Sequence, residues 1–121
     1  LDSSYKLDLI KDYLASKEMY IGVHYMKKKK WIAAINRFKN VVNNYDDTSF
    51  IDEALHRLVE LHYKLGLADE SKKYASLLGY NYQSSEWYSK SYKIFNKEYK
   101  SKLQIKKEKE GIFNRFKKLL Y

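Results

Sequence analysis

Residues 15–48, ASKEMYIGVHYMKKKKWIAAINRFKNVVNNYDDT, decide the fold. In this stretch the small residues Gly22 and Ala34 stand at helical spacing among the large residues Ile21, Tyr25 and Phe38. Small residues allow two paired helices to approach closely, and large residues fill the gaps between neighbouring pairs. The pattern predicts an antiparallel helical hairpin whose turn lies at the lysine run 27–30.

A second copy of the pattern spans residues 52–85. Aligning the two turns places Gly66 on Lys29, an offset of 37 residues. The tetratricopeptide pattern has a period of about 34 residues, so about three residues are added to the linker. Two tandem copies predict an all-α fold of stacked tetratricopeptide-like hairpins, an α-solenoid. The equivalent residues of the second copy are Ala54, Leu55, Leu58, Tyr63, Gly66 and Ser71.

Apolar periodicity and capping residues predict the individual helices. We expect helices over 31–44, from 51 to 65, from 68 or 69 to 78, and over 86–96 as a capping helix. Glycine favours the left-handed conformation that ends helices, so Gly66 and Gly79 are the expected stops. Ser3 or Ser4 is the expected cap of the first helix, and Ser84-Ser85 that of the fifth. The periodic apolar residues of the first two helices are Leu7, Ile10, Leu14, Ile21, Ile32, Ile35, Phe38 and Val42.

Composition narrows the class of protein. The chain has 121 residues, which suits one domain, and contains no cysteine, which excludes disulfide scaffolds, zinc ribbons and thiol catalysis. The absence of proline disfavours a turn-rich β-sandwich. Apolar runs are far shorter than the roughly 20 residues that span a bilayer. Because the chain does not begin with Met, we interpret it as an excised fragment or a processed chain.

The basic charge is concentrated in residues 97–121. The whole chain carries a net charge of +9, and this segment holds nine Lys or Arg against three Glu. Its apolar residues recur at helical spacing, which predicts a basic amphipathic C-terminal helix beside a repeat domain of residues 1–96. Such a helix can lie on anionic lipid, dock on an acidic partner or fold back as a solenoid cap. The candidate contact residues are Phe113, Arg115, Phe116, Lys117 and Leu120.

No enzymatic, metal or cofactor site is expected. The histidines His24, His56 and His62 lack the spacing of metal ligands, and we interpret His56 and Glu60 as an ordinary helix-surface pair. No nucleophile elbow or phosphate-binding glycine loop occurs. Tyrosines at core spacing are explained by packing, so nucleic acid is not an expected partner. Arg37 stands out because arginine is rare here, and a mid-helix arginine suggests a site that needs a fork-shaped donor.

The repeat region resembles the BamD/ComL tetratricopeptide lipoproteins of the bacterial outer-membrane β-barrel assembly machine, in their α-proteobacterial form. The matching stretches are LASKEMYIG at 14–22, WIAAINRFK at 31–39, VVxxYxDT at 41–48, EALxRLVE at 53–60, LGL at 65–67 and LGYNYxxSEWY at 78–88. The resemblance covers roughly residues 1–95 and corresponds to the C-terminal half of that family. The family's lipidated cysteine is not in this chain, and its Tyr-Pro turns appear here as Tyr45-Asp46 and Tyr82-Gln83.

The resemblance implies a non-enzymatic scaffold on the periplasmic face of the outer membrane. The C-terminal half of such proteins docks on the POTRA domains of the barrel-forming subunit, BamA, and other subunits of the machine are further possible partners. By position, Arg37 matches a family arginine implicated in that docking. Adjacency to Arg37 and the neighbouring turns adds the candidate partner-binding residues Asn36, Asn40, Lys27, Lys28, Tyr45, Asp46, Asp47 and Thr48.

Overall fold

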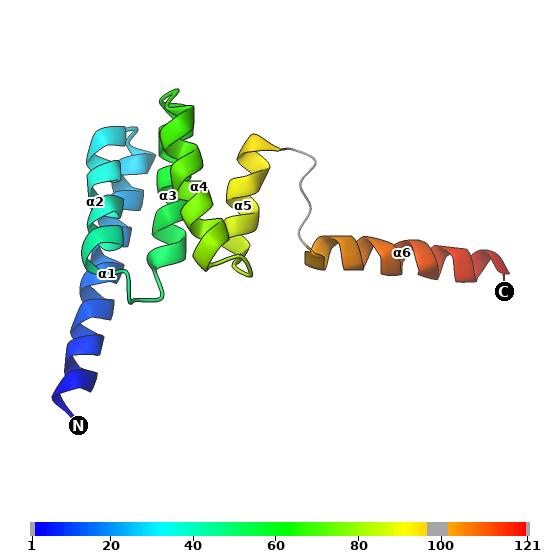
Figure 1. Ribbon diagram of the computed structural model, residues 1–121, viewed down its shortest axis with the longest axis horizontal. Helices are drawn as coiled ribbons and strands as arrows, with labels where there is room; N and C mark the ends of the chain where they lie inside the picture. Colours follow the sequence, from blue (N-terminus) through cyan, green and yellow to red (C-terminus); the bar gives the residue numbers. More distant parts are fainter. Residues whose placement is uncertain (1, 97–101, 121) are drawn as a thin grey trace.

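Helical hairpins follow one another along the chain in the computed structural model, which describes residues 2–96 and 102–120. The helices are α1 (Ser3–Lys27), α2 (Trp31–Asn44), α3 (Ile51–Lys64), α4 (Ala68–Asn81), α5 (Glu86–Phe95) and α6 (Lys102–Leu120). No strand occurs among these described residues. α1 pairs with α2 and α3 with α4, α5 packs on the second pair, and α6 extends away from the five-helix body (Figure 1). The expected all-α class is confirmed; of the predicted tail 97–121, residues 97–101 and 121 lie outside the described residues.

The two hairpins have the same register. α4 begins and ends 37 residues after α2, and α3 ends 37 residues after α1. The turn after α1 is closed by Lys29 N–H donating to the Met26 carbonyl at 2.9 Å and by Lys30 N–H donating to the Tyr25 carbonyl at 2.9 Å. The same two bonds recur around Gly66 at 3.0 and 2.9 Å. This is the Schellman helix ending, so the predicted equivalence of Lys29 and Gly66 is confirmed.

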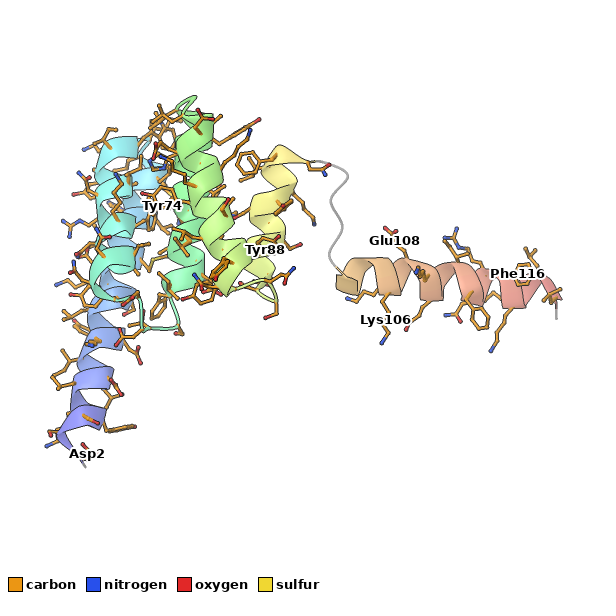
Figure 2. The ribbon with its side chains drawn as sticks, viewed as in Figure 1. Asp2, Tyr74, Tyr88, Lys106, Glu108 and Phe116 are labelled. Carbon is orange, nitrogen blue, oxygen red and sulfur yellow. The ribbon has the colours of Figure 1, made fainter. Side chains whose placement is uncertain are left out.

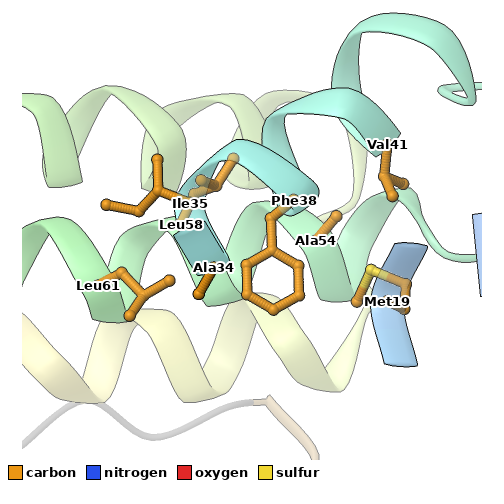
Figure 3. Close-up of a cluster of buried hydrophobic side chains, with 8 residues drawn as sticks. All are labelled: Met19, Ala34, Ile35, Phe38, Val41, Ala54, Leu58 and Leu61. Atoms are coloured by element: carbon orange, nitrogen blue, oxygen red, sulfur yellow. The ribbon is translucent and has the colours of Figure 1, made fainter. Parts of the chain in front are cut away.

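α3 is the central helix because two of its faces are buried. Residues from α1, α2 and α3 form the first core, shown in Figure 3. An adjoining face of α3 packs on α4 and α5 in a second core. The first core consists of Met19, Ala34, Ile35, Phe38, Val41, Ala54, Leu58 and Leu61. The second consists of Ile51, Leu55, Val59, Ala75, Leu78 and Tyr88.

Small residues stand where helices approach one another. A Cβ added at Gly22 would lie 2.6 Å from Cε1 of Phe38, so α1 and α2 can be this close only with glycine at that point. Ser71 is fully buried, and its hydroxyl donates to the Val59 carbonyl at 2.7 Å, which joins α4 to α3. The expected roles of these small residues in close helix packing are therefore confirmed.

Two predicted helix ends are wrong. Asp2, rather than Ser3 or Ser4, caps α1: its side chain accepts a hydrogen bond from the Ser4 N–H at 2.7 Å. Gly79 does not stop α4, which continues to Asn81. A Cβ at Gly79 would lie 2.8 Å from Cε2 of Tyr88, so this glycine makes room for a side chain of α5. At the fifth helix, Ser85 is the cap as expected and accepts from Trp87 N–H at 3.1 Å.

The periodic apolar residues at the beginning of α1 are not core residues. Leu7 and Ile10 are more than half exposed and Leu14 is also exposed, whereas Ala15 and Met19 further along the helix are buried. α1 has 25 residues and α2 only 14, so α2 covers only the second half of α1. In α2 itself Ile32 is exposed. The buried residues of this helix are Ala34, Ile35, Phe38 and Val41.

Candidate functional site

Arg37 lies in the middle of α2 and is held by α1. Its Nη1 donates to Glu18 Oε1 at 3.0 Å. The Glu18 side chain is 15% exposed and that of Arg37 is 40% exposed, so the carboxylate is sheltered while part of the guanidinium faces solvent. A guanidinium fixed at one nitrogen retains a preferred direction for its remaining N–H groups. Arg37 is therefore an ordered, outward-facing donor for a carboxylate or carbonyl of another molecule.

Polar residues adjoin Arg37 on α2. Asn36 is exposed, and Asn40, one turn on, is partly exposed and accepts a hydrogen bond from the Asn44 side-chain amide. Together with Arg37 these amides give α2 a polar edge with both donors and acceptors. We call Asn36, Arg37 and Asn40 the α2 edge. The structure places all three where a partner can reach them.

The remaining candidates lie at the two ends of α2. Lys27 and Lys28 are exposed at the turn that precedes α2, and Asp46 and Asp47 are exposed at the turn that follows it. A helix of 14 residues is about 21 Å long, so the two turns do not form one compact patch with Arg37. They extend the α2 edge into a line that is basic at one end and acidic at the other.

Tyr45 and Thr48 have roles inside the turn. The Tyr45 ring is half-buried against the first core, and its carbonyl accepts from the Thr48 N–H at 3.1 Å and the Thr48 hydroxyl at 2.7 Å. Thr48 is 6% exposed. These two residues shape the α2–α3 turn, and the exposed contact groups of that turn are the neighbouring aspartates.

Asp47 is paired with Lys11 of α1. Lys11 Nζ lies 2.9 Å from Asp47 Oδ2. The hydrogen bond to Lys11 lowers the pKa of the Asp47 carboxyl, and the same bond raises the pKa of the Lys11 ammonium. Both groups are exposed, so they keep a hydrated ion pair that a partner can compete for. Sequence reasoning missed Lys11 and Glu18, because 36 and 19 residues separate them from their partners.

A polar cluster between α3 and α5 contradicts the expectation that His56 and Glu60 form a surface pair. His56 is 5% exposed; its Nδ1 is 2.7 Å from Ser91 Oγ and its Nε2 is 3.1 Å from Glu60 Oε1. The Trp87 ring lies against the imidazole, with centroids 5.1 Å apart, and the Arg57 guanidinium lies over the Trp87 ring at 5.3 Å. His56 is buried because α5 covers this face of α3.

Ser91, His56 and Glu60 contact one another in the order of a hydrolytic triad, but the burial of Ser91 is unlike that of a catalytic serine. Ser91 is fully buried, so its hydroxyl has no path to a substrate. The cluster therefore joins α5 to α3. Among residues 2–96 and 102–120, no group of three or more His, Asp or Glu side chains could hold a metal ion.

α6 displays its side chains to solvent along the described part of its length. The five candidate residues lie on it, and Phe116, labelled in Figure 2, stands clear of the other helices. Phe113 and Phe116 are 57% and 59% exposed, and Leu120 is 65% exposed. Lys117 Nζ lies over the Phe113 ring at 5.2 Å. The expected basic amphipathic helix is present, with its apolar residues uncovered.

The fold and the α2 edge define a helical-repeat protein of the tetratricopeptide type. The family model described as YfiO, outer membrane lipoprotein, matches residues 1–78. The chain belongs to this family, as the resemblance in its sequence predicted.

Curated relatives carry the name outer membrane protein assembly factor BamD. The protein of Rickettsia prowazekii is 57% identical over 94 residues, covering 78% of this chain and 38% of the relative. That of Caulobacter vibrioides is 43% identical over 95 residues, covering 78% of this chain and 31% of the relative. The chain thus spans about a third of the length of these relatives. No solved structure matches it significantly.

Proposed function

We propose that this chain acts as a non-enzymatic scaffold in the assembly of outer-membrane β-barrel proteins, on the periplasmic face of the outer membrane. Family membership and the name of the BamD relatives support an assembly role. A rigid stack of hairpins with an exposed polar edge suits protein binding. None of the described helices is long and apolar enough to cross a membrane.

The proposed partner surface is the α2 edge, and its partner is the POTRA domains of a BamA-like subunit. The observation that carries this assignment is Arg37, fixed by Glu18 yet 40% exposed. Arginines anchored on one side are suited to be binding hot spots, because little side-chain freedom is lost when the partner docks. Lys28 and Asp46 at the two ends of α2 supply complementary charges that orient the partner.

Calorimetry with purified POTRA domains tests the assignment. Arg37→Ala should weaken binding about tenfold or more, as for loss of an arginine hot spot. It should leave the fold intact, since a partly exposed ion pair contributes about 1 kcal/mol or less. Arg37→Lys keeps the charge and loses the fork, so it should recover only part of the affinity.

The matched control is Lys39→Ala, which removes an exposed cation from α2 two residues away. Its affinity should stay close to that of the unsubstituted chain. Equal affinities of the Arg37→Ala and Lys39→Ala variants would overturn the role of Arg37. Absence of any binding by the unsubstituted chain would overturn the POTRA assignment itself.

A further inference from the structure

α6 carries an apolar stripe that nothing in the described structure covers. Its five large apolar residues lie within an arc of about 120° on the helix, computed at 100° per residue. Their exposed fractions range from 57% to 85%. In Figure 1 the helix stands apart from α1–α5. We define the α6 stripe as Ile112, Phe113, Phe116, Leu119 and Leu120.

Cations border the stripe on both sides. Residues 106–120 contain six Lys or Arg and two Glu. On the helix, Lys106 and Lys117 flank one edge of the stripe, with Glu110 beside them. Arg115 flanks the other edge, with Glu108 beside it, and Lys118 lies on the opposite face. Lys109 lies one turn before Phe113, at the N-terminal limit of the stripe. The long stems of these side chains can run along apolar surface while their charged ends stay in water.

We propose that α6 binds the surface of an anionic phospholipid bilayer and lies parallel to it. In this position the stripe enters the boundary between headgroups and acyl chains, and the flanking cations Lys106, Lys117 and Arg115 meet phosphate groups. A bilayer surface offers phosphates on both sides of the stripe, so the cations at both edges are satisfied together.

This assignment is separate from the proposed function. The family match covers residues 1–78, so α6 lies beyond it. The α2 edge and the α6 stripe belong to different helices and use different chemistry. The family's description as an outer membrane lipoprotein makes a bilayer a reasonable neighbour of the chain.

Vesicle flotation with the full chain tests the proposal. The chain should float with vesicles of phosphatidylcholine and phosphatidylglycerol, and far less with phosphatidylcholine alone. The triple variant Phe113→Ser, Phe116→Ser, Leu120→Ser should lose this binding. The matched control is Tyr13→Ser, Leu77→Ser, Tyr80→Ser, which removes exposed apolar side chains elsewhere and should float like the unsubstituted chain.

Charge substitutions give a graded response. Lys117→Gln and Arg115→Gln should each lower the partition coefficient about fivefold, since one basic residue near an anionic surface contributes about 1 kcal/mol. Added salt should weaken binding in the same direction. Arg37→Ala should not change flotation, so failure here and failure of POTRA binding are distinguishable.

Two results would overturn the proposal. The first is no flotation of the unsubstituted chain with the anionic vesicles. The second is equal flotation of the triple variant. If the first result comes with loss of POTRA binding or of self-association in the triple variant, the stripe is assigned to a protein.

Discussion

Lys29 and Gly66 stand 37 residues apart, occupy the same place in two successive turns, and have φ angles of 60° and 78°. Both turns need a left-handed residue because both close with the same pair of hydrogen bonds. Glycine adopts this conformation without strain, whereas a residue with a Cβ is strained by about 1–2 kcal/mol. The first turn therefore carries a local strain that the second does not.

Exchanging residues at these turns should change stability in opposite directions. Lys29→Gly should raise the free energy of unfolding by about 0.5–1 kcal/mol. This is the strain that is relieved, minus the stability that is lost because glycine gives the unfolded chain more conformational freedom. Gly66→Ala should lower it by about 1 kcal/mol, and no neighbour within 4 Å would contribute to the loss. Urea unfolding measures both. A stabilising Gly66→Ala would contradict the argument.

Gly22→Ala should destabilise the first hairpin by about 1–3 kcal/mol, because the new Cβ meets the buried Phe38 ring. Gly111→Ala is the matched control: nothing lies within 4 Å of its added Cβ, and alanine favours a helix interior. The control should leave the unfolding temperature of the repeat core unchanged. Thermal unfolding compares the two variants. Phe38→Leu added to Gly22→Ala should recover part of the loss, and simple additivity would argue against the contact.

The His56–Ser91 hydrogen bond replaces an apolar pair of the preceding repeat. Met19 and Ala54, each 37 residues earlier, belong to the first core. Ser91→Ala leaves the buried imidazole without this partner and should cost about 1–3 kcal/mol of unfolding free energy.

Adding His56→Met to Ser91→Ala should recover part of that cost, since both partners are then apolar as in the first repeat, although the His56–Glu60 interaction is also lost. Ser76→Ala is the control for the single change, because Ser76 is exposed and its hydroxyl bonds its own helix at 2.9 Å. Chemical denaturation of the unsubstituted chain, Ser91→Ala, His56→Met, the double variant and Ser76→Ala measures the coupling. A double variant as unstable as the sum of its single changes would contradict the repeat equivalence.

Stability should fall on acidification partly through Glu60. The hydrogen bond from His56, aided by the charges of His56 and Arg57, lowers the pKa of the Glu60 carboxyl below its ordinary value of 4.5, although burial opposes the shift. A lowered folded pKa contributes stability above the unfolded pKa, and this contribution is lost as pH falls through the folded pKa.

Urea unfolding at about pH 6 and about pH 3 measures this dependence. The unsubstituted chain should lose more stability than Glu60→Gln over this interval. Asp47→Asn is the comparison, because the Asp47 carboxyl also has a lowered pKa but lies on the exposed surface. Parallel pH curves for the unsubstituted chain and Glu60→Gln would contradict the role of Glu60.

Repeat spacing predicted the hairpins well, and tertiary contacts account for what it missed. The helix Trp31–Asn44 and the stop at Gly66 were expected as the structure has them. The predicted helix end at Gly79 was wrong. Glycine occurs both where φ is positive and where there is no room for a Cβ, and a single sequence does not show which of the two reasons applies. Here the missing Cβ makes room for Tyr88, a residue of a different helix.

The same reason applies to the candidate site. Arg37 was found from its rarity and from resemblance, but Glu18, which holds it, lies on a different helix and has no sequence signal of its own. Burial of His56 depends on α5, whose packing against α3 is set by residues far along the chain. The 37-residue alignment would have pointed to His56, because its counterpart Met19 is a core residue.

The unequal lengths of α1 and α2 have a consequence for how amide protons exchange with solvent. The first dozen residues of α1 are exposed, and isolated helical segments of this length are marginally stable in water. The Asp2 cap and the Lys11–Asp47 pair are both on the surface and add little protection. Deuterium should therefore enter the first half of α1 quickly and its second half, which α2 covers, slowly, so that one continuous helix has two different exchange lifetimes.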